Sequence, residues 1–245
     1  MNDTRGAGAD LPSWSWLWLP VGFVLLQHGF YLYDAPLYRR LFESELGFIE
    51  LATPAMALVA MVSGIGVLRR RVRLPGAWLG IWFGLGALAC FYFAGEELSW
   101  GQQLFRWQTP EAWNAVNDQH ETNLHNTSSW LDQKPRLLLQ IGILAGGIIY
   151  PLTWGRRRPP QPASWQYWLW PTMACLPTGV LALGIHLLDH SRVLHHAGEV
   201  LSYIRYSETT ELYYAWFLLL YFASIRHRLD RLAAANARLS GRCGG

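Results

Sequence analysis

One stretch of the sequence concentrates side chains that can perform acid–base or metal chemistry. It covers residues 94–126 and reads AGEELSWGQQLFRWQTPEAWNAVNDQHETNLHN. The adjacent carboxylates Glu96 and Glu97 are followed by Glu121 and His125. Carboxylates act as general acids and bases, and carboxylates together with imidazoles are donors that zinc and other divalent metals accept. These residue types indicate a functional site, with Glu96, Glu97 and Glu121 as the candidate catalytic residues.

A second group of candidate metal ligands lies in LGIHLLDHS, where His186 and His190 are four residues apart. On a helix this spacing places both imidazoles on one face, which provides half of a divalent metal site. We therefore predict a divalent metal, zinc in the first place, held by His186, His190 and His125. Six further residues are predicted to contact substrate or to support the site: Gln102, Asn123, Glu50, His28, Glu208 and Glu211.

The elements that must position these residues are long apolar runs. The chain has 245 residues, of which 51% are hydrophobic and 15% charged, and the charges fall between the runs. A helix needs about 20 apolar residues to cross a bilayer, where the backbone must satisfy its own hydrogen bonds. The sequence therefore predicts an all-α polytopic membrane helical bundle with about six transmembrane helices. A soluble bundle of buried helices is the alternative, which runs of this length disfavour. The predicted spans are 15–33, 48–68, 76–95, 137–154, 165–187 and 210–225.

Basic segments predict the orientation of these spans. Arginines concentrate at 69–73, at 156–158 and after residue 225, on every second connection. The excess of Lys and Arg in cytoplasmic loops places these segments, the tail 1–14 and the basic tail 228–245 in the cytoplasm. We expect a bacterial inner (cytoplasmic) membrane protein with both termini cytoplasmic. The net charge of +3 is then explained without a nucleic-acid partner. The N-terminus lacks signal-peptide features, so we expect the first span to be retained.

This topology collects the ionisable residues at the outer end of the membrane domain 15–227. Five of the six predicted spans present an acid or an imidazole there, and the fourth presents Gln140. Such side chains are costly in a bilayer unless they share a polar cavity, pair with each other or bind a metal. The outer loops 34–47, 96–136 and 189–209 are expected to be structured and to carry short interfacial helices that roof the site.

The strings GEELSWGQQLF, QTPEAW and HETNLHN resemble a signature of bacterial multi-pass membrane proteins of uncharacterised function. The resemblance covers about residues 95–126 and implies a membrane protein without assigning an activity. Separately, His186 and His190 are similar to the HxxxH pair of the alkaline ceramidase and progestin/adipoQ receptor superfamily. That likeness implies a zinc ion held by three histidines, the third being His28, His120 or His125. This chain departs from it in having six predicted spans, and no Ser-x-x-x-His on an early span.

The leading hypothesis is a metal-dependent hydrolase or transferase that acts on a lipid or lipid-linked substrate at the outer, periplasmic leaflet. A metal held by the histidines, with His125 or Glu121 as the third ligand, would activate a bound water. Glu96 or Glu97 would act as the general acid or base, while Gln102 and Asn123 would orient the substrate.

Three other functions are considered. A proton-coupled transporter could use Glu50, Glu96 and Glu97, although carriers place their sites near the membrane midplane. A haem subunit would leave the carboxylates unexplained. An accessory or assembly subunit could dock a periplasmic protein partner through Trp107, Trp113 and Trp130.

Overall fold

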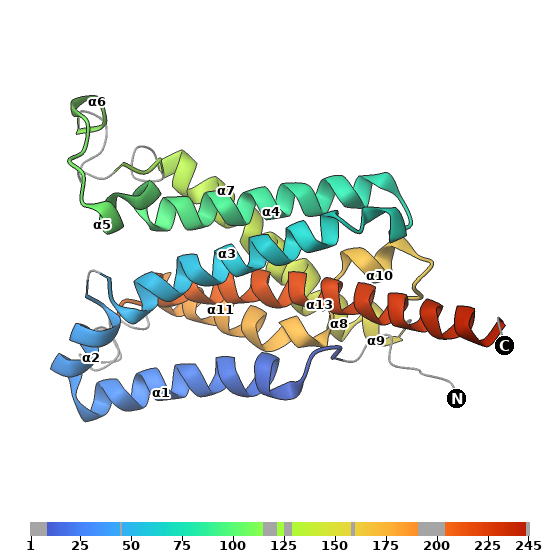
Figure 1. Cartoon of the computed structure of the whole chain (residues 1–245). Helices are drawn as coiled ribbons and strands as arrows, with labels where there is room; N and C mark the ends of the chain where they lie inside the picture. The colour runs from blue at the N-terminus through green and yellow to red at the C-terminus, as the bar shows by residue number, and fades with distance from the viewer. Residues whose placement is uncertain are drawn as a thin grey trace.

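The structure is a computed structural model that describes residues 9–44, 46–114, 122–124, 129–157, 160–190 and 204–243. Every regular element in these ranges is a helix, which confirms the predicted all-α class (Figure 1). The elements are η1 Trp14–Trp18, α1 Leu19–Tyr33, α2 Ala35–Phe42, α3 Phe48–Leu68, η2 Arg71–Arg73, α4 Ala77–Glu97, η3 Ser99–Gly101, α5 Gln102–Phe105, α6 Glu111–Asn114, α7 Ser129–Gly142, η5 Ile143–Ile149, α8 Tyr150–Leu152, α9 Trp154–Arg157, α10 Trp165–Leu169, η6 Met173–Cys175, α11 Leu176–His190 and α13 Tyr206–Cys243.

Within the described residues, four helical stretches are long and apolar enough to cross a membrane. They are Phe48–Leu68, Ala77–Glu97, Gln133–Arg157 and Trp165–Asp189. A membrane-embedded protein is therefore supported, whereas the predicted count of about six spans is not confirmed. The other two predicted spans fall in η1 with α1 and in α13, and both carry polar atoms on Trp, Tyr, Gln or His side chains that lower their mean hydropathy.

Helix α13 runs through the middle of the bundle, with α3 and α11 packed directly against it (Figure 1). Its buried face is rich in aromatic residues, including Tyr213, Tyr214, Phe217 and Phe222. A Cβ atom at Gly86 of α4 would lie 2.8 Å from the ring of Phe222, so only glycine permits this approach. In a membrane, such close contact of small residues with neighbouring helices is a main source of packing energy.

The predicted span 165–187 is divided in the structure. Helix α10 ends at Leu169, and Trp170 adopts an extended conformation with φ −81° and ψ 138°. The residue before a proline is driven out of the helical region, and Pro171 follows. Thr172 then caps η6 by accepting a hydrogen bond from the Ala174 N–H, and the chain continues into α11.

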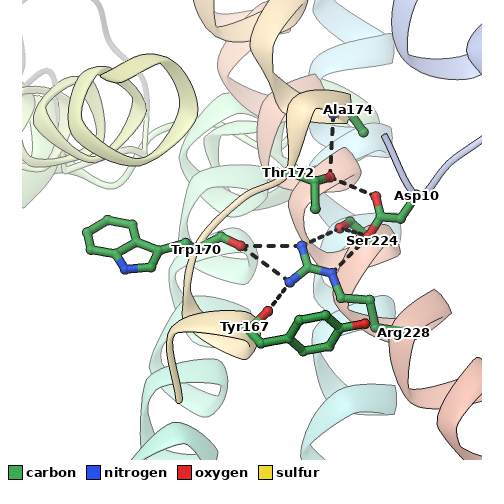
Figure 2. Close-up of polar contacts among 7 residues, drawn as sticks. All are labelled: Asp10, Tyr167, Trp170, Thr172, Ala174, Ser224 and Arg228. Atoms are coloured by element: carbon green, nitrogen blue, oxygen red, sulfur yellow. Dashed lines mark hydrogen bonds and ion pairs between the residues drawn. The ribbon is translucent and has the colours of Figure 1, made fainter. Parts of the chain in front are cut away.

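A buried polar network joins the N-terminal segment to α13 at one end of the bundle (Figure 2). Arg228 Nε donates to Asp10 Oδ2 at 2.8 Å, and its Nη atoms donate to Ser224 and to the Tyr167 and Trp170 carbonyls. Thr172 and Ser224 hydroxyls donate to the same carboxylate at 2.7 and 2.6 Å. Sequence analysis did not identify this network, because its partners come from three distant segments.

The C-terminal part of α13 lies with α9 and α10 at one end of the bundle, whereas α2, α5 and α6 lie at the opposite end (Figure 1). Asp34 accepts a hydrogen bond from the Leu37 N–H at 2.9 Å, so it caps α2, a short helix within the loop 34–47. The end with α2, α5 and α6 is called the outer end below, and the other end is called the inner end.

The Asp10 network predicts a large effect of Arg228→Ala on stability. Burial alone would raise the pKa of Asp10, but the Arg228 charge and the hydrogen bonds from Ser224, Arg228 and Thr172 outweigh it and lower this pKa below 3.8. Removing the guanidinium leaves a buried carboxylate uncompensated, which costs about 3–5 kcal/mol. Thermal unfolding in detergent should show this loss for Arg228→Ala and little change for Arg238→Ala, which removes an exposed cation from the same helix.

The same pKa shift fixes the pH dependence of this contribution. Because folding lowers the pKa of Asp10, the stabilisation is fully present above pH 3.8 and is lost as the pH falls through the folded-state value. Equal unfolding temperatures for Arg228→Ala and the natural protein at neutral pH would contradict the assignment.

Candidate functional site

The carboxylates Glu96 and Glu97 end helix α4 and point to different partners. Adjacent residues of a helix diverge by about 100°. Glu96 is only 4% exposed and meets the loop that follows α4, whereas Glu97 is partly buried beside α13 and α7. The two neighbours therefore belong to two different parts of the outer end.

Glu96 fastens the segment 122–124 to the end of α4. Trp100 Nε1 donates to Glu96 Oε1 at 2.7 Å, and the Leu124 N–H donates to Glu96 Oε2 at 2.7 Å. Hydrogen bonds to a charged acceptor are about twice as strong as neutral ones. Both oxygens of Glu96 are thus engaged in holding the loop, which assigns this residue a positioning role.

A turn of unusual backbone conformation follows Glu96. Ser99, Trp100 and Gly101 have φ values of 46°, 57° and 100°, in the left-handed region. Each non-glycine residue in such a conformation costs about 1–3 kcal/mol and persists only where its surroundings enforce it. The Trp100 ring lies directly over Gly95, where a Cβ atom would be 2.8 Å from the ring, and Trp100 also donates to Glu96. These contacts hold the turn in place.

Gln102 and Asn123 complete the connection between the loops. Gln102 Nε2 donates to Thr109 Oγ1 at 2.7 Å, and Gln102 Oε1 accepts from the Thr122 N–H at 2.6 Å. Asn123, which is 1% exposed, donates to the Ser99 hydroxyl at 3.3 Å. The three sequence strings singled out above therefore meet in space, and their polar residues bind one another.

Glu97 belongs to a cluster of four carboxylates around one arginine. The charges of Glu211, Glu208, Arg136 and Glu50 all act on Glu97, which brings α4, α13, α7 and α3 together at the outer end. Arg136 donates to Glu211 Oε1 at 2.7 Å, and both side chains are largely buried. We call Glu50, Glu97, Glu208, Glu211 and Arg136 the acidic cluster.

Burial raises the pKa of Glu208 above its ordinary value, and the Glu50 carboxylate raises it further, while Arg205 opposes the shift. Like charges in a site of reduced polarity favour the protonated form of a carboxyl group. A carboxyl group with a raised pKa can act as a general acid or base.

Of the histidines in the predicted site, the structure describes the side chains of His28 and His186. His28 Nδ1 is 2.8 Å from the Val24 carbonyl oxygen, and His28 Nε2 is 3.4 Å from the Tyr206 hydroxyl. His186 is partly buried on α11. Glu121 and His125 lie outside the described residues, as does the side chain of His190.

No three His, Cys, Asp or Glu side chains among the described residues lie close enough together to hold a metal ion. The predicted zinc ligands are His186, His190 and either His125 or Glu121, and of these only the side chain of His186 belongs to that part of the chain. The metal therefore stays a prediction.

Arg136 is the residue of this cluster that sequence analysis missed. It stands just before the predicted span 137–154, at the outer end, where the excess of basic residues in cytoplasmic loops leads one to expect few arginines. An arginine just before this span, on the same side as the four acids, was the sequence feature that could have identified Arg136 as part of the cluster.

The Glu96 contacts predict that Glu96→Ala releases the segment 122–124. Loss of both acceptors should speed hydrogen exchange at the Leu124 amide, which donates to Glu96 Oε2. Glu96→Gln keeps one carbonyl oxygen as acceptor and should give an intermediate rate. Hydrogen exchange followed by mass spectrometry can compare these variants with Glu111→Ala, which removes an exposed acid from the same loop. Unchanged exchange in Glu96→Ala would refute the role of this carboxylate.

Comparisons with protein-family models, curated proteins and solved structures gave no match to this chain.

Proposed function

We propose that the chain is an integral membrane enzyme, a hydrolase or transferase that acts on a lipid or lipid-linked substrate at the outer leaflet of a bacterial inner membrane. One observation carries the proposal: four helices of an apolar bundle bring four carboxylates and Arg136 together at one end. Intramembrane or interfacial ionisable groups are costly and mark functional sites by default.

The proposed topology has six spans, with η1–α1 and α13 added to the four apolar stretches. Six crossings would return the chain to the side on which it began, and the C-terminal part of α13 lies at the inner end (Figure 1). The arginines of η2, Arg71 and Arg73, and those of α9, Arg156 and Arg157, are proposed to face the same side. Under the rule that basic loops face the cytoplasm, the acidic cluster faces the periplasm.

Within the cluster, Glu211 and Glu97 have unlike surroundings. Arg136 forms an ion pair with Glu211 at 2.7 Å, whereas Glu97 faces the charges of Glu211 and Glu208. Carboxylates in unlike environments divide the roles of acid and base between them. In the proposed reaction Glu211 accepts a proton from the attacking water or hydroxyl, and Glu97 donates one to the departing oxygen.

A divalent metal, zinc in the first place, is proposed to lie beside these carboxylates. The side chains proposed to hold it are His186 of α11 with His125, His190 or Glu121. When bound, the ion would supply Lewis-acid polarisation of a carbonyl or phosphoryl oxygen. Metal analysis of the purified chain should find about one zinc per chain, and less in His186→Ala; equal metal content in both would contradict the assignment of this ligand.

A second candidate function is docking of a periplasmic protein partner, which the exposed aromatics of the outer loop favour. Phe105 is 76% exposed and stacks on Trp107 with ring centroids 6.0 Å apart and an interplanar angle of 8°. Aromatic residues exposed in this way are enriched at protein interfaces. Phe105→Ala would abolish docking and leave an enzyme in the acidic cluster intact.

The enzyme hypothesis predicts that Glu97→Gln and Glu211→Gln abolish a lipid conversion. General acid–base groups contribute about 10²–10⁴ to a rate, so each variant should be slower by at least about 100-fold. The natural chain and the variants are reconstituted in vesicles of total bacterial lipid extract, and lipid species are followed by mass spectrometry. Glu111→Gln, which removes an exposed acid outside the cluster, is the matched control.

Thermal unfolding of each variant separates lost chemistry from lost folding. The proposal requires a lipid species that changes with the natural chain and with Glu111→Gln, and that persists with folded Glu97→Gln. No change with the natural chain, or conversion at equal rates by Glu97→Gln, would count against it.

A further inference from the structure

A second site lies at the inner end, far from the acidic cluster, on the surface between α3 and α13. It is a groove of about 380 Å³ lined by Val62, Ile65, Gly66, Arg69, Arg70 and Arg226. Its floor is apolar and its rim is cationic. The proposed enzymatic function does not use it.

The floor belongs to a helix that is apolar and long enough to cross the membrane, Phe48–Leu68. Leu58, Val62, Ile65 and Arg69 follow one another at steps of three or four residues, so they form one face of α3. From Leu58 to Arg69 this face is about 16 Å long at 1.5 Å per residue. Val62 is 56% exposed and Leu58 is 36% exposed, so the face is open to its surroundings.

The rim carries uncompensated positive charge. Asp230 forms an ion pair with Arg70. Among the described residues, no carboxylate pairs with Arg69 or with Arg226. The Arg226 side chain lies over Gly66, with its Nη1 atom 3.8 Å from the position that a Cβ atom would take there, so the guanidinium stands directly above the groove.

We propose that this groove binds an anionic phospholipid, with its phosphate group at Arg69 and Arg226 and an acyl chain along Val62 and Ile65. The position of the acyl chain and of the phosphate along the groove follows from α3. Its apolar face lies inside the span, and Arg69 comes directly after its last residue, Leu68. Basic pockets between transmembrane helices at this level recognise acidic headgroups. Guanidinium groups match the oxygens of a phosphate in geometry. A free phosphate ion would use the rim but would leave the apolar floor without a role.

The test uses the full chain, purified in detergent, freed of lipid and mixed with equal amounts of phosphatidylglycerol and phosphatidylcholine that carry identical acyl chains. Native mass spectrometry counts the lipids that remain bound. The natural chain should retain phosphatidylglycerol in excess. Each arginine near an acidic headgroup contributes about fivefold to retention, so Arg69→Gln with Arg226→Gln should lower the excess by an order of magnitude or more.

Two controls define the site. Arg238→Gln removes an exposed cation of α13 beyond the groove and should leave the excess unchanged. Val62→Trp fills the apolar floor while the arginines remain, and should lower the retention of both lipids. Thermal unfolding confirms that each variant is folded.

The proposal is overturned if the natural chain retains both lipids equally, or if the double arginine variant keeps the excess. It is also overturned if an excess of inorganic phosphate removes the bound phosphatidylglycerol, because the groove would then select the free ion.

Discussion

Helix α13 is surrounded by other helices, so every polar side chain that it carries needs a partner on a neighbour. An unpaired polar group in an apolar surrounding costs several kcal/mol, roughly the stability of a small domain. The Tyr213 hydroxyl donates to the Pro20 carbonyl, and the Tyr221 hydroxyl donates to the Leu169 carbonyl at 2.8 Å. Gln140 of α7 donates to the Tyr214 hydroxyl at 2.7 Å. These bonds fix the rotation of α13 against α1, α7 and the end of α10.

The two ends of α13 meet this requirement in opposite ways. At the inner end Arg228 is paired with Asp10, and two hydroxyls and two carbonyls satisfy the remaining donors and acceptors. That network is balanced in charge and is structural. At the outer end the charges of Glu208 and Glu211 act together with those of Glu50, Glu97, Arg136 and Arg205. That cluster brings several acids from different helices together at the end of the bundle.

Sequence analysis predicted the parts of the structure that depend on local patterns. The apolar runs gave the helical class and the positions of α3 and α4. The predicted count of about six spans is not confirmed, because Tyr, Trp, Gln and His lower the hydropathy of α1 and α13, although interhelical hydrogen bonds satisfy some of their polar atoms. The break in the helix before Pro171 was not predicted either, because an apolar run does not show whether its helix is continuous.

The candidate site was predicted as a region and not as a set of contacts. Composition and topology brought Glu50, Glu97, Glu208 and Glu211 to one end, but periodicity could not show that Glu96 turns to the loop while Glu97 turns to α13. Glu96 accepts hydrogen bonds from the Trp100 indole and the Leu124 amide, whereas Gln102 and Asn123 bind backbone groups or small hydroxyls. Such partners leave no signature in a sequence, so the predictions of Glu96 as catalytic and of Gln102 and Asn123 as substrate contacts did not include these loop contacts.

The central claim is that the charges at the outer end of α13 interact as one unit with those of the neighbouring helices. A double-mutant cycle on Arg136→Gln and Glu211→Gln, read by unfolding of the chain in detergent, tests it most directly. The account predicts a coupling of about 0.5–3 kcal/mol, since the two side chains share one ion pair of 2.7 Å. Additive effects of the two substitutions would show that this pair does not form, and would remove the basis for a shared site.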